Sequence, residues 1–346
     1  MTGQQGRQAH GAVLSGLLLA TLIGVDIALG IPINGSYALS ALLAAAMATS
    51  VRFTAGLAAL AVALSAASGL WNDNFSTAAW GLRLVLCATL AVLAVVTTSI
   101  RARRDVALQH MTLVADKAQR ALFRAVPSQV GPVGIATRYV SATRDALVGG
   151  DLYEVASSRY GVRVLMGDVR GKGLDAVQMA GTVLGAFRHA ASDAPTLESL
   201  ACKLDTVVAA VAEDEDFVTC LLAEFHTDGT VSMVNCGHHQ PFLVTVGGAS
   251  EMVSTGEPVP PLGLAPTPRS VTGPWPDGSR MLFYTDGLVE ARNRQGAFFP
   301  LAGSAAALSH GDLDQALDGL LQDLARHTGP RVRDDLALLL VEHRAA

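Results

Sequence analysis

The stretch GGDLYEVASSRYGVRVLMGD, residues 149–168, decides the fold of the second half of the chain. It reads as two apolar strands separated by the loop SRYG, which is the pattern of an antiparallel hairpin. If Ser157 pairs with Val162, this register places Asp151 directly opposite Asp168. Like charges that face each other destabilise a sheet, so the arrangement requires a compensating cation or separation by solvent.

The run MGDVRGKG at the end of this hairpin has the composition of a phosphate-binding loop. A Walker loop requires four residues between its first glycine and the Gly-Lys pair, followed by Ser or Thr. Only three residues separate Gly167 from Gly171, and Gly173 stands where the hydroxyl residue should be. The spacing excludes an ATP site and leaves Arg170 and Lys172 as phosphate neighbours or as residues of a solvated turn.

Aspartates also stand at the ends of two later apolar strands. Asp286 follows MLFYT, and Asp334 and Asp335 precede LALLLVEH. A single aspartate at a strand end is usually a turn former, but antiparallel pairing would bring these acids together at one edge. Clustered carboxylates with few histidines select Mg²⁺ or Mn²⁺ over zinc.

The order of elements after residue 128 predicts an α+β domain with antiparallel sheets. Short apolar strands follow one another through tight turns, and helical stretches are expected at 173–191, 196–213 and 312–327. The four cysteines lack CxxC spacing, which favours reduced thiols in a cytosolic domain, and none begins a Cys-x5-Arg phosphatase signature. The net charge of −5 and 5% aromatic content argue against nucleic acid as a partner.

The first hundred residues predict an α-helical membrane domain of about four spans. The chain is 50% hydrophobic, and this excess is concentrated before Arg101. About 20 apolar residues are needed for a helix to cross a bilayer core. The candidate spans are residues 12–31, 36–51, 53–70 and 83–100, of which the second is short and alanine-rich.

The arginines that follow the last span place the catalytic half in the cytoplasm, as a multi-pass protein of the cell membrane. They are Arg101, Arg103 and Arg104. With four spans the N-terminus lies on the same side, whereas failure of the second segment to span would move it outside. Asp26, inside the first span, is either a sensor or proton site or a group that reaches the interface.

A juxtamembrane helix at 106–126 joins the two halves. Its apolar seam of about two heptads predicts either a homodimer contact or packing on its own domain; the seam residues are Leu108, Met111, Ala115, Ala118 and Leu122. His110 raises the alternative of a sensor histidine kinase, but no ATP lid follows it. The predicted division is a membrane domain at 1–100, a linker at 101–127 and a catalytic domain at 128–346.

Six motifs of the second half, in their order and spacing, resemble the bacterial SpoIIE-like branch of the metal-dependent (PPM, type 2C) protein serine/threonine phosphatases. They are GGDLYEV, GDVRGKGLDAVQMAG, FVTCLLAEF, VNCGHHQPFLV, LFYTDGLVEARN and RDDLALLLV, within residues 116–343. Each motif alone is weak, whereas the ordered set is specific. The membrane-anchored layout is similar to a form of this branch.

The resemblance implies two stacked antiparallel β-sheets flanked by helices, with two Mn²⁺ or Mg²⁺ ions at one edge. Asp168 would bridge both ions, and the carbonyl group of Val169 would bind one of them. Asp286 and Asp334 would complete the ligand set, and Asp151 would lie in it or next to it. Asp334 is preferred over its neighbour because the motif's ligand is the first acid of the pair.

The implied reaction is hydrolysis of phosphoserine or phosphothreonine by a metal-activated water, without a covalent phosphoenzyme. Asp168, Asp286 and Asp334 are therefore the predicted catalytic residues. Arg170 stands where eukaryotic members have a histidine, so the general acid differs here. Lys172 is a predicted substrate contact together with Arg170.

His238, in the sequence GHHQP where the branch usually has Gly-His-x-Pro-Pro, is a further predicted substrate contact, with a structural turn as the alternative. The partner implied by the resemblance is a phosphorylated signalling protein, such as an anti-sigma-factor antagonist. The remaining alternative is a catalytically silent membrane sensor or binding module that keeps the phosphatase fold.

Overall fold

The computed structural model forms two compact units, residues 1–109 and residues 110–346. Each unit is described by itself below. The three-part division expected from the sequence remains a prediction. The structure describes residues 2–30, 32–47, 49–122, 124–140, 149–213, 215–329 and 334–344.

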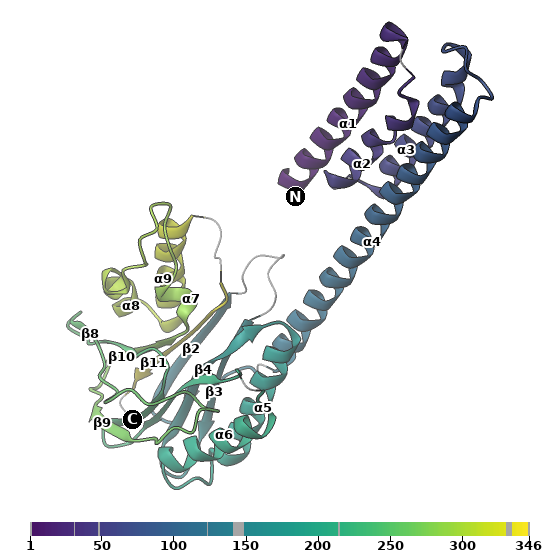
Figure 1. The fold of residues 1–346 in the computed structure, drawn as a ribbon. Coiled ribbons are helices and arrows are strands. Elements are labelled where there is room, and N and C mark those ends of the chain that lie inside the picture. The colour runs from purple at the N-terminus through teal and green to yellow at the C-terminus, as the bar shows by residue number, and fades with distance from the viewer. Residues whose placement is uncertain are drawn as a thin grey trace. The chain divides into compact units, whose positions relative to one another are not determined.

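The first unit is a bundle of helices (Figure 1). Its elements are α1 (Thr2–Leu29), η1 (Asn34–Ser36), α2 (Leu39–Ala46), α3 (Val51–Ala67), η2 (Ser68–Leu70) and α4 (Ala78–Leu122). Among the described residues, three helical stretches are long and apolar enough to cross a membrane: Ala9–Leu29, Val51–Leu70 and Ala78–Ala107. The apolar segments of the sequence thus form the expected helical domain, with one difference in the second segment.

The second apolar segment, expected as a helical span at 36–51, contains a helix of only eight residues, α2. At ~1.5 Å per residue this helix covers only ~12 Å. The segment nevertheless runs the depth of the bundle. Asn34 Nδ2 donates to the carbonyl of Ser65 at one end, and Arg101 Nη1 donates to the carbonyl of Ala45 at the other. The chain therefore traverses the bundle four times, and the second traverse is a broken helix.

Asp26 is fully buried in this bundle and does not reach its surface. Asn72 Nδ2 donates to its Oδ1 at 2.7 Å, and the hydroxyl of Tyr37 donates to its Oδ2. Polar side chains that bond to one another across apolar helices hold the helices together. Asn72 belongs to the segment between η2 and α4, and both expectations for Asp26 stay predictions.

Helix α4 begins in the first unit and continues without a break to Leu122. The backbone thus confirms a helix over most of the predicted linker. The side chains of residues 108–122 lie outside the described part of the chain, so the predicted heptad seam and the role of His110 stay predictions.

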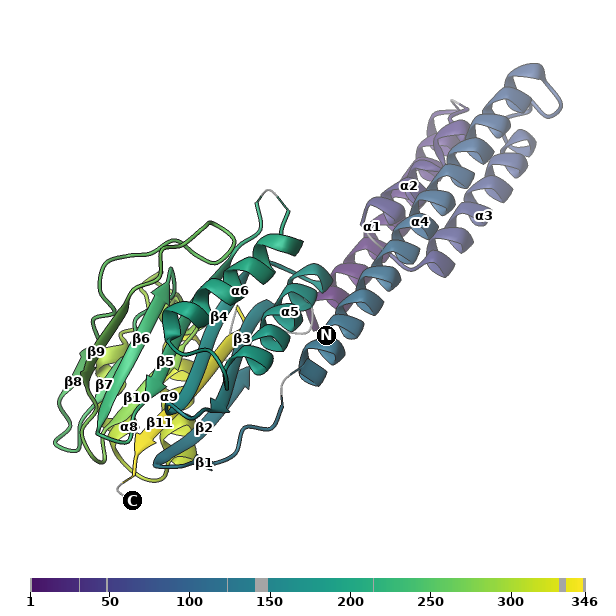
Figure 2. The ribbon, with the colours of Figure 1, turned by 90° about the horizontal axis from the view of Figure 1, so that it is seen from below.

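The second unit is a sandwich of two antiparallel sheets, as the resemblance implied (Figure 2). One sheet has the order β1 (Gln129–Val130), β2 (Val133–Val140), β11 (Leu336–His343), β10 (Arg280–Tyr284), β7 (Phe242–Val244) and β8 (Ser250–Met252). The other has the order β3 (Gly149–Ser157), β4 (Val162–Lys172), β5 (Val218–Phe225), β6 (Thr230–Cys236) and β9 (Ser270–Pro274). We call them the β11 sheet and the β4 sheet.

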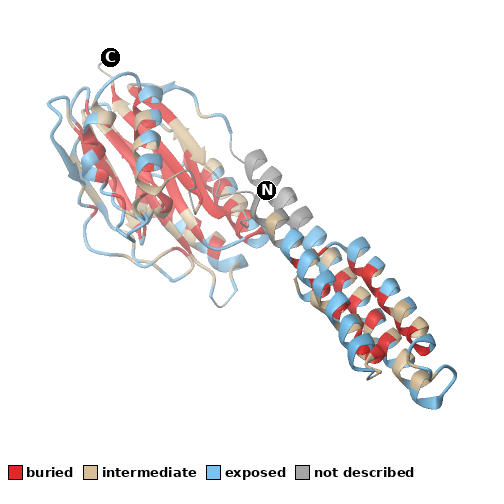
Figure 3. Cartoon of the chain, turned by 90° about the horizontal axis from the view of Figure 1, so that it is seen from above, coloured by how far each residue is buried: buried red, intermediate tan, exposed pale blue. Residues whose placement is uncertain are grey.

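Helices cover the outer face of each sheet, and buried residues fill three layers (Figure 3). On the β4 sheet lie α5 (Leu174–Ala190) and α6 (Leu197–Val211); on the β11 sheet lie α7 (Asp286–Val289), η3 (Leu301–Ser304), α8 (Ala305–Ser309) and α9 (Leu313–Thr328). Between the sheets, Phe225 packs on Trp275 and Phe283. This apolar centre fixes the sheets face to face, so that their strand ends meet along common edges.

Candidate metal centre

The β3–β4 hairpin supplies the first pair of acids. Ser157 pairs with Val162 and Asp151 pairs with Asp168, which confirms the register expected from the sequence. The neighbouring strand β5 pairs Thr219 with Asp168 on its other side. Asp168 is therefore fixed in the interior of the β4 sheet, close to the end of its strand.

The β10–β11 pair supplies the other acids from the β11 sheet. Tyr284 pairs with Leu338, and the amide of Thr285 donates to the carbonyl of Ala337. Asp286 follows as the first residue of α7, and the acids at 334 and 335 directly precede β11. Antiparallel pairing thus brings these acids to one edge of the sandwich, as expected.

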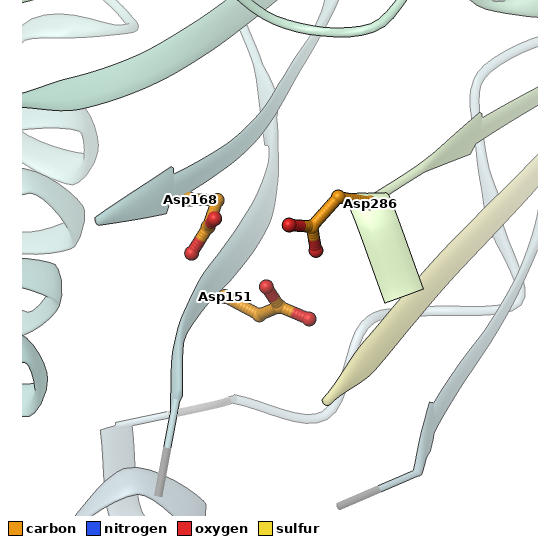
Figure 4. A group of neighbouring side chains, drawn as sticks. All are labelled: Asp151, Asp168 and Asp286. Atoms are coloured by element: carbon orange, nitrogen blue, oxygen red, sulfur yellow. The ribbon is translucent and has the colours of Figure 1, made fainter. Parts of the chain in front are cut away.

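Three of the acids from the two sheets converge (Figure 4). One carboxylate oxygen from each of Asp151, Asp168 and Asp286 lies within 4.8 Å of the others. Asp151 is buried, whereas Asp168 and Asp286 are half-buried. Such a set of oxygen donors from separate strands has the chemistry of a site for a hard divalent cation.

Asp334 lies beside this group and is held by a lysine. Lys172 Nζ is 2.7 Å from Asp334 Oδ1, and both side chains are about half exposed. The hydrogen bond to Asp334 raises the pKa of Lys172. A positive charge thus stands next to the acidic group and partly neutralises it.

Burial and mutual repulsion disfavour the ionised form of these acids. Burial, the charge of Asp286 and the charge of Asp334 raise the pKa of Asp168 to about 7. Burial and then the charge of Asp168 raise the pKa of Asp151 well above its ordinary value. The pKa of Asp286 is also raised, by burial and by Asp334. A bound divalent cation would reverse these effects, because it stabilises the ionised carboxylates.

The two glycines of the GGD motif allow the backbone to pack closely around the acids. A Cβ atom on Gly150 would collide with the carbonyl oxygen of Val169, and one on Gly149 would collide with the carboxylate of Asp335. Gly149 N–H donates to this Asp335 carboxylate, which is buried. The carbonyl of Val169, a predicted ligand, is therefore accommodated only because residue 150 has no side chain.

All three predicted substrate contacts have partners in the structure: Lys172 pairs with Asp334, and Arg170 and His238 have the following partners. Arg170 Nη2 forms an ion pair with Glu215 Oε2 at 2.8 Å, at the protein surface. The ring nitrogens of His238 are 2.9 Å from Thr219 Oγ1 and 3.1 Å from the Tyr284 carbonyl, and burial lowers its pKa to about 3. The side chain of His238, which follows β6, therefore connects this segment to β5 and β10. This agrees with the alternative of a structural turn.

Sequence reasoning did not single out Thr285, and it gave Asp335 only as a weaker ligand candidate than Asp334, although both residues adjoin the acids. Thr285 is fully buried and hydrogen-bonds to Asp151. Its only signal in the sequence is a polar residue at the end of the apolar strand MLFYT. The partner of such a hydroxyl depends on contacts between sheets, which a single sequence does not specify.

Comparison with known proteins agrees with this geometry. Residues 158–344 match the family model of the Stage II sporulation protein E (SpoIIE). The structure of the RsbU and RsbW domains of Rv1364c from Mycobacterium tuberculosis is 26% identical, with a TM-score of 0.53 over 62% of this chain. This chain covers 60% of that structure, so it spans about three fifths of its length.

Two further structures share the fold. The SiaA-PP2C domain of Pseudomonas aeruginosa has a TM-score of 0.57 at 17% identity, covering 70% of this chain and 98% of that domain. The PP2C phosphatase domain of SpoIIE from Bacillus subtilis, with a fragment of its regulatory domain, has a TM-score of 0.51 at 14% identity, covering 61% and 63%. Because the second unit is a sandwich of this type, the alternative of a sensor histidine kinase is discarded. The chain thus belongs to the SpoIIE family, and its second unit has the fold of the PP2C phosphatase domains.

Proposed function

We propose that this chain is a membrane-anchored protein phosphatase that uses divalent cations to hydrolyse phosphoserine or phosphothreonine. The observation that carries the proposal is the convergence of Asp151, Asp168 and Asp286 within 4.8 Å in a domain of the PP2C type. The mechanism implied by the family resemblance needs no covalent phosphoenzyme, so we assign no covalent step.

The residues present fit two Mg²⁺ or Mn²⁺ ions. All the side-chain donors are carboxylates, which suit hard cations, and the backbone leaves room for the Val169 carbonyl. We propose that Asp168, Asp286, Asp334 and Asp151 would hold the ions, with carboxylates from both sheets. When bound, divalent cations supply an activated water and neutralise charge on the phosphoryl oxygens.

The protein itself then has two tasks in the reaction. The acids, fixed at the ends of paired strands from both sheets, would hold the cations in place beside the phosphoryl group. Lys172 supplies a positive charge beside Asp334 that can bind a phosphoryl oxygen. Arg170, like Lys172 in an ion pair at the surface, stays a proposed contact of the phosphoryl group. We leave His238 out of the proposed substrate contacts, because its buried ring is held by Thr219 and the Tyr284 carbonyl.

We further propose that the substrate is a phosphorylated signalling protein, of the anti-sigma-factor antagonist class that the family resemblance implies. The four traverses of the first unit and the arginines after residue 100 support a multi-pass protein with its phosphatase domain in the cytoplasm. A homodimer through the 106–126 helix is part of the same proposal.

Hydrolysis of a phosphoserine peptide by the full chain in nanodiscs tests the function. We expect turnover only with Mn²⁺ or Mg²⁺, and a loss of about 100-fold or more in Asp168→Asn and Asp286→Asn. Asp228→Asn, in the exposed turn between β5 and β6, serves as the matched control.

Turnover without a divalent cation, or full activity in both site variants, would overturn the proposal. If the wild-type chain binds Mn²⁺ but hydrolyses no phosphopeptide, a catalytically silent module is the better description.

A further inference from the structure

Thr285 forms a link between the two sheets at the acidic group. Its side chain is fully buried, at the end of β10 and directly before Asp286. The amide of Ala337 donates to Thr285 Oγ1 at 2.9 Å. Thr285 Oγ1 in turn lies 2.7 Å from Asp151 Oδ2.

The direction of these two hydrogen bonds is fixed by chemistry. A backbone N–H can only donate, so the hydroxyl of Thr285 must accept from Ala337. When Asp151 is ionised, as it would be with a cation bound, its Oδ2 can only accept, so the single proton of the hydroxyl is directed at it. Oδ2 of Asp151 is therefore an acceptor, and the orientation of its carboxylate is set by the backbone of β11 through one side chain.

This link joins residues that are far apart in the sequence and belong to different sheets. Ala337 and Thr285 belong to the β11 sheet, whereas Asp151 is in β3 of the β4 sheet. The Gly149 amide and the Asp335 carboxylate make a second connection at the same edge. The acids of the proposed metal centre come from both sheets, so these connections set the distance between its two halves.

We propose that Thr285 is a positioning residue of the metal centre, which orients Asp151 and holds the acids of one sheet against those of the other. This inference rests on the proposed function. The role requires a hydroxyl group, because valine has nearly the same shape but leaves Asp151 Oδ2 and the Ala337 amide without partners. Partners that orient metal ligands in this way typically change metal affinity by about 10–100-fold when removed.

The test measures Mn²⁺ binding to the full chain in nanodiscs, by calorimetry and by electron paramagnetic resonance of free Mn²⁺. We expect Thr285→Val to weaken Mn²⁺ binding by about 10–100-fold, whereas Thr285→Ser retains affinity within about threefold. Thr272→Val is the matched control, since Thr272 is an exposed strand threonine that bonds to Ser232.

A double-substitution experiment tests whether Thr285 acts through Asp151. In an Asp151→Asn background, we expect Thr285→Val to cause no further loss of Mn²⁺ affinity. If valine unfolds the domain, Thr285→Cys takes its place, because a thiol is a weak donor and should give an intermediate affinity.

Three outcomes overturn the inference: wild-type affinity in Thr285→Val, equal losses in the serine and valine variants, or additive losses with Asp151→Asn. Each differs from failure of the proposed function, in which the wild-type chain binds Mn²⁺ normally but does not hydrolyse the phosphopeptide. Failure of the wild-type chain to bind Mn²⁺ overturns both.

Discussion

Asp151 and Asp168 lie directly opposite each other on paired strands, and burial followed by the charge of Asp168 raises the pKa of Asp151. Two ionised carboxylates in this position repel each other. Binding of a proton or of a divalent cation relieves the repulsion, so protons and cations compete for the carboxylate oxygens of Asp151 and Asp168. This competition connects the stability of the domain to pH and to metal concentration.

Without divalent cations, the phosphatase domain should be more stable at about pH 5.5 than at about pH 8. The folded-state pKa of Asp168 is about 7, above its ordinary value of 3.8. The folded state therefore keeps a proton that the unfolded chain has released, and stability is lost as pH rises through 7. Fluorescence of the buried Trp275 in a Trp71→Phe, Trp80→Phe background reports the unfolding of this domain.

Asp168→Asn should flatten this pH dependence, and saturating Mn²⁺ should remove it in the wild-type chain. Stability that increases from acidic to alkaline pH in the metal-free protein would contradict the assignment of a raised pKa to Asp168.

Lys172→Met should tighten Mn²⁺ binding by about three- to tenfold, because it removes a positive charge 2.7 Å from Asp334. If Lys172 also binds the phosphoryl group, KM for the phosphopeptide should rise by about tenfold in the same variant. Titration calorimetry and steady-state kinetics measure the two effects separately. Lys203→Met, on the exposed face of α6, should change neither, and weaker Mn²⁺ binding in Lys172→Met would contradict the expectation.

His238→Ala should destabilise the domain by about 1–3 kcal/mol while KM changes by less than about twofold. The reason is that its buried ring contacts Thr219 Oγ1 and the Tyr284 carbonyl. Since its pKa is lowered to about 3, the ring stays neutral at working pH and should add no limb to the pH–rate profile. Urea unfolding measures the loss of stability, and steady-state kinetics measure KM. A large increase in KM at unchanged stability would show that His238 contacts the substrate.

Labelling of introduced cysteines should place the N-terminus and the phosphatase domain on one side of the membrane. This follows from four traverses of the bundle. The background is Cys202→Ser, since the other three cysteines are buried. In this background an impermeant maleimide should label Gln4→Cys from one side and Ser76→Cys from the other. Cys202 of the wild-type chain reports the side of the phosphatase domain and should be labelled together with residue 4. Labelling of residues 4 and 76 from the same side would contradict the path.

Much of the metal centre could be predicted from the sequence because its acids belong to short-range patterns. The four-residue loop after Ser157 fixes the hairpin register, and with it the opposition of Asp151 and Asp168. The same reasoning placed Asp286 at the end of β10. Register is strongly specified where one face of a strand is buried, as it is here.

Contacts that depend on packing between segments could not be predicted in this way. The partner of Thr285 lies in the opposite sheet, and the partner of Arg170 lies after α6. The second membrane segment has the composition of a span, but Asn34 and Tyr37 bond to neighbouring segments where a regular helix was expected. Hydrophobicity shows that a segment is buried without showing its backbone conformation.

The position of β11 in the sandwich has a consequence for the synthesis of the protein. Among the described strands β11 is made after all the others, yet it lies between β2 and β10 in the middle of its sheet. Asp334 and Asp335 enter the edge of the sandwich together with it. A nascent or truncated chain that lacks residues 334–343 therefore lacks Asp334 and the strand that pairs with β10, so cation capture would distinguish finished phosphatase domains from unfinished ones.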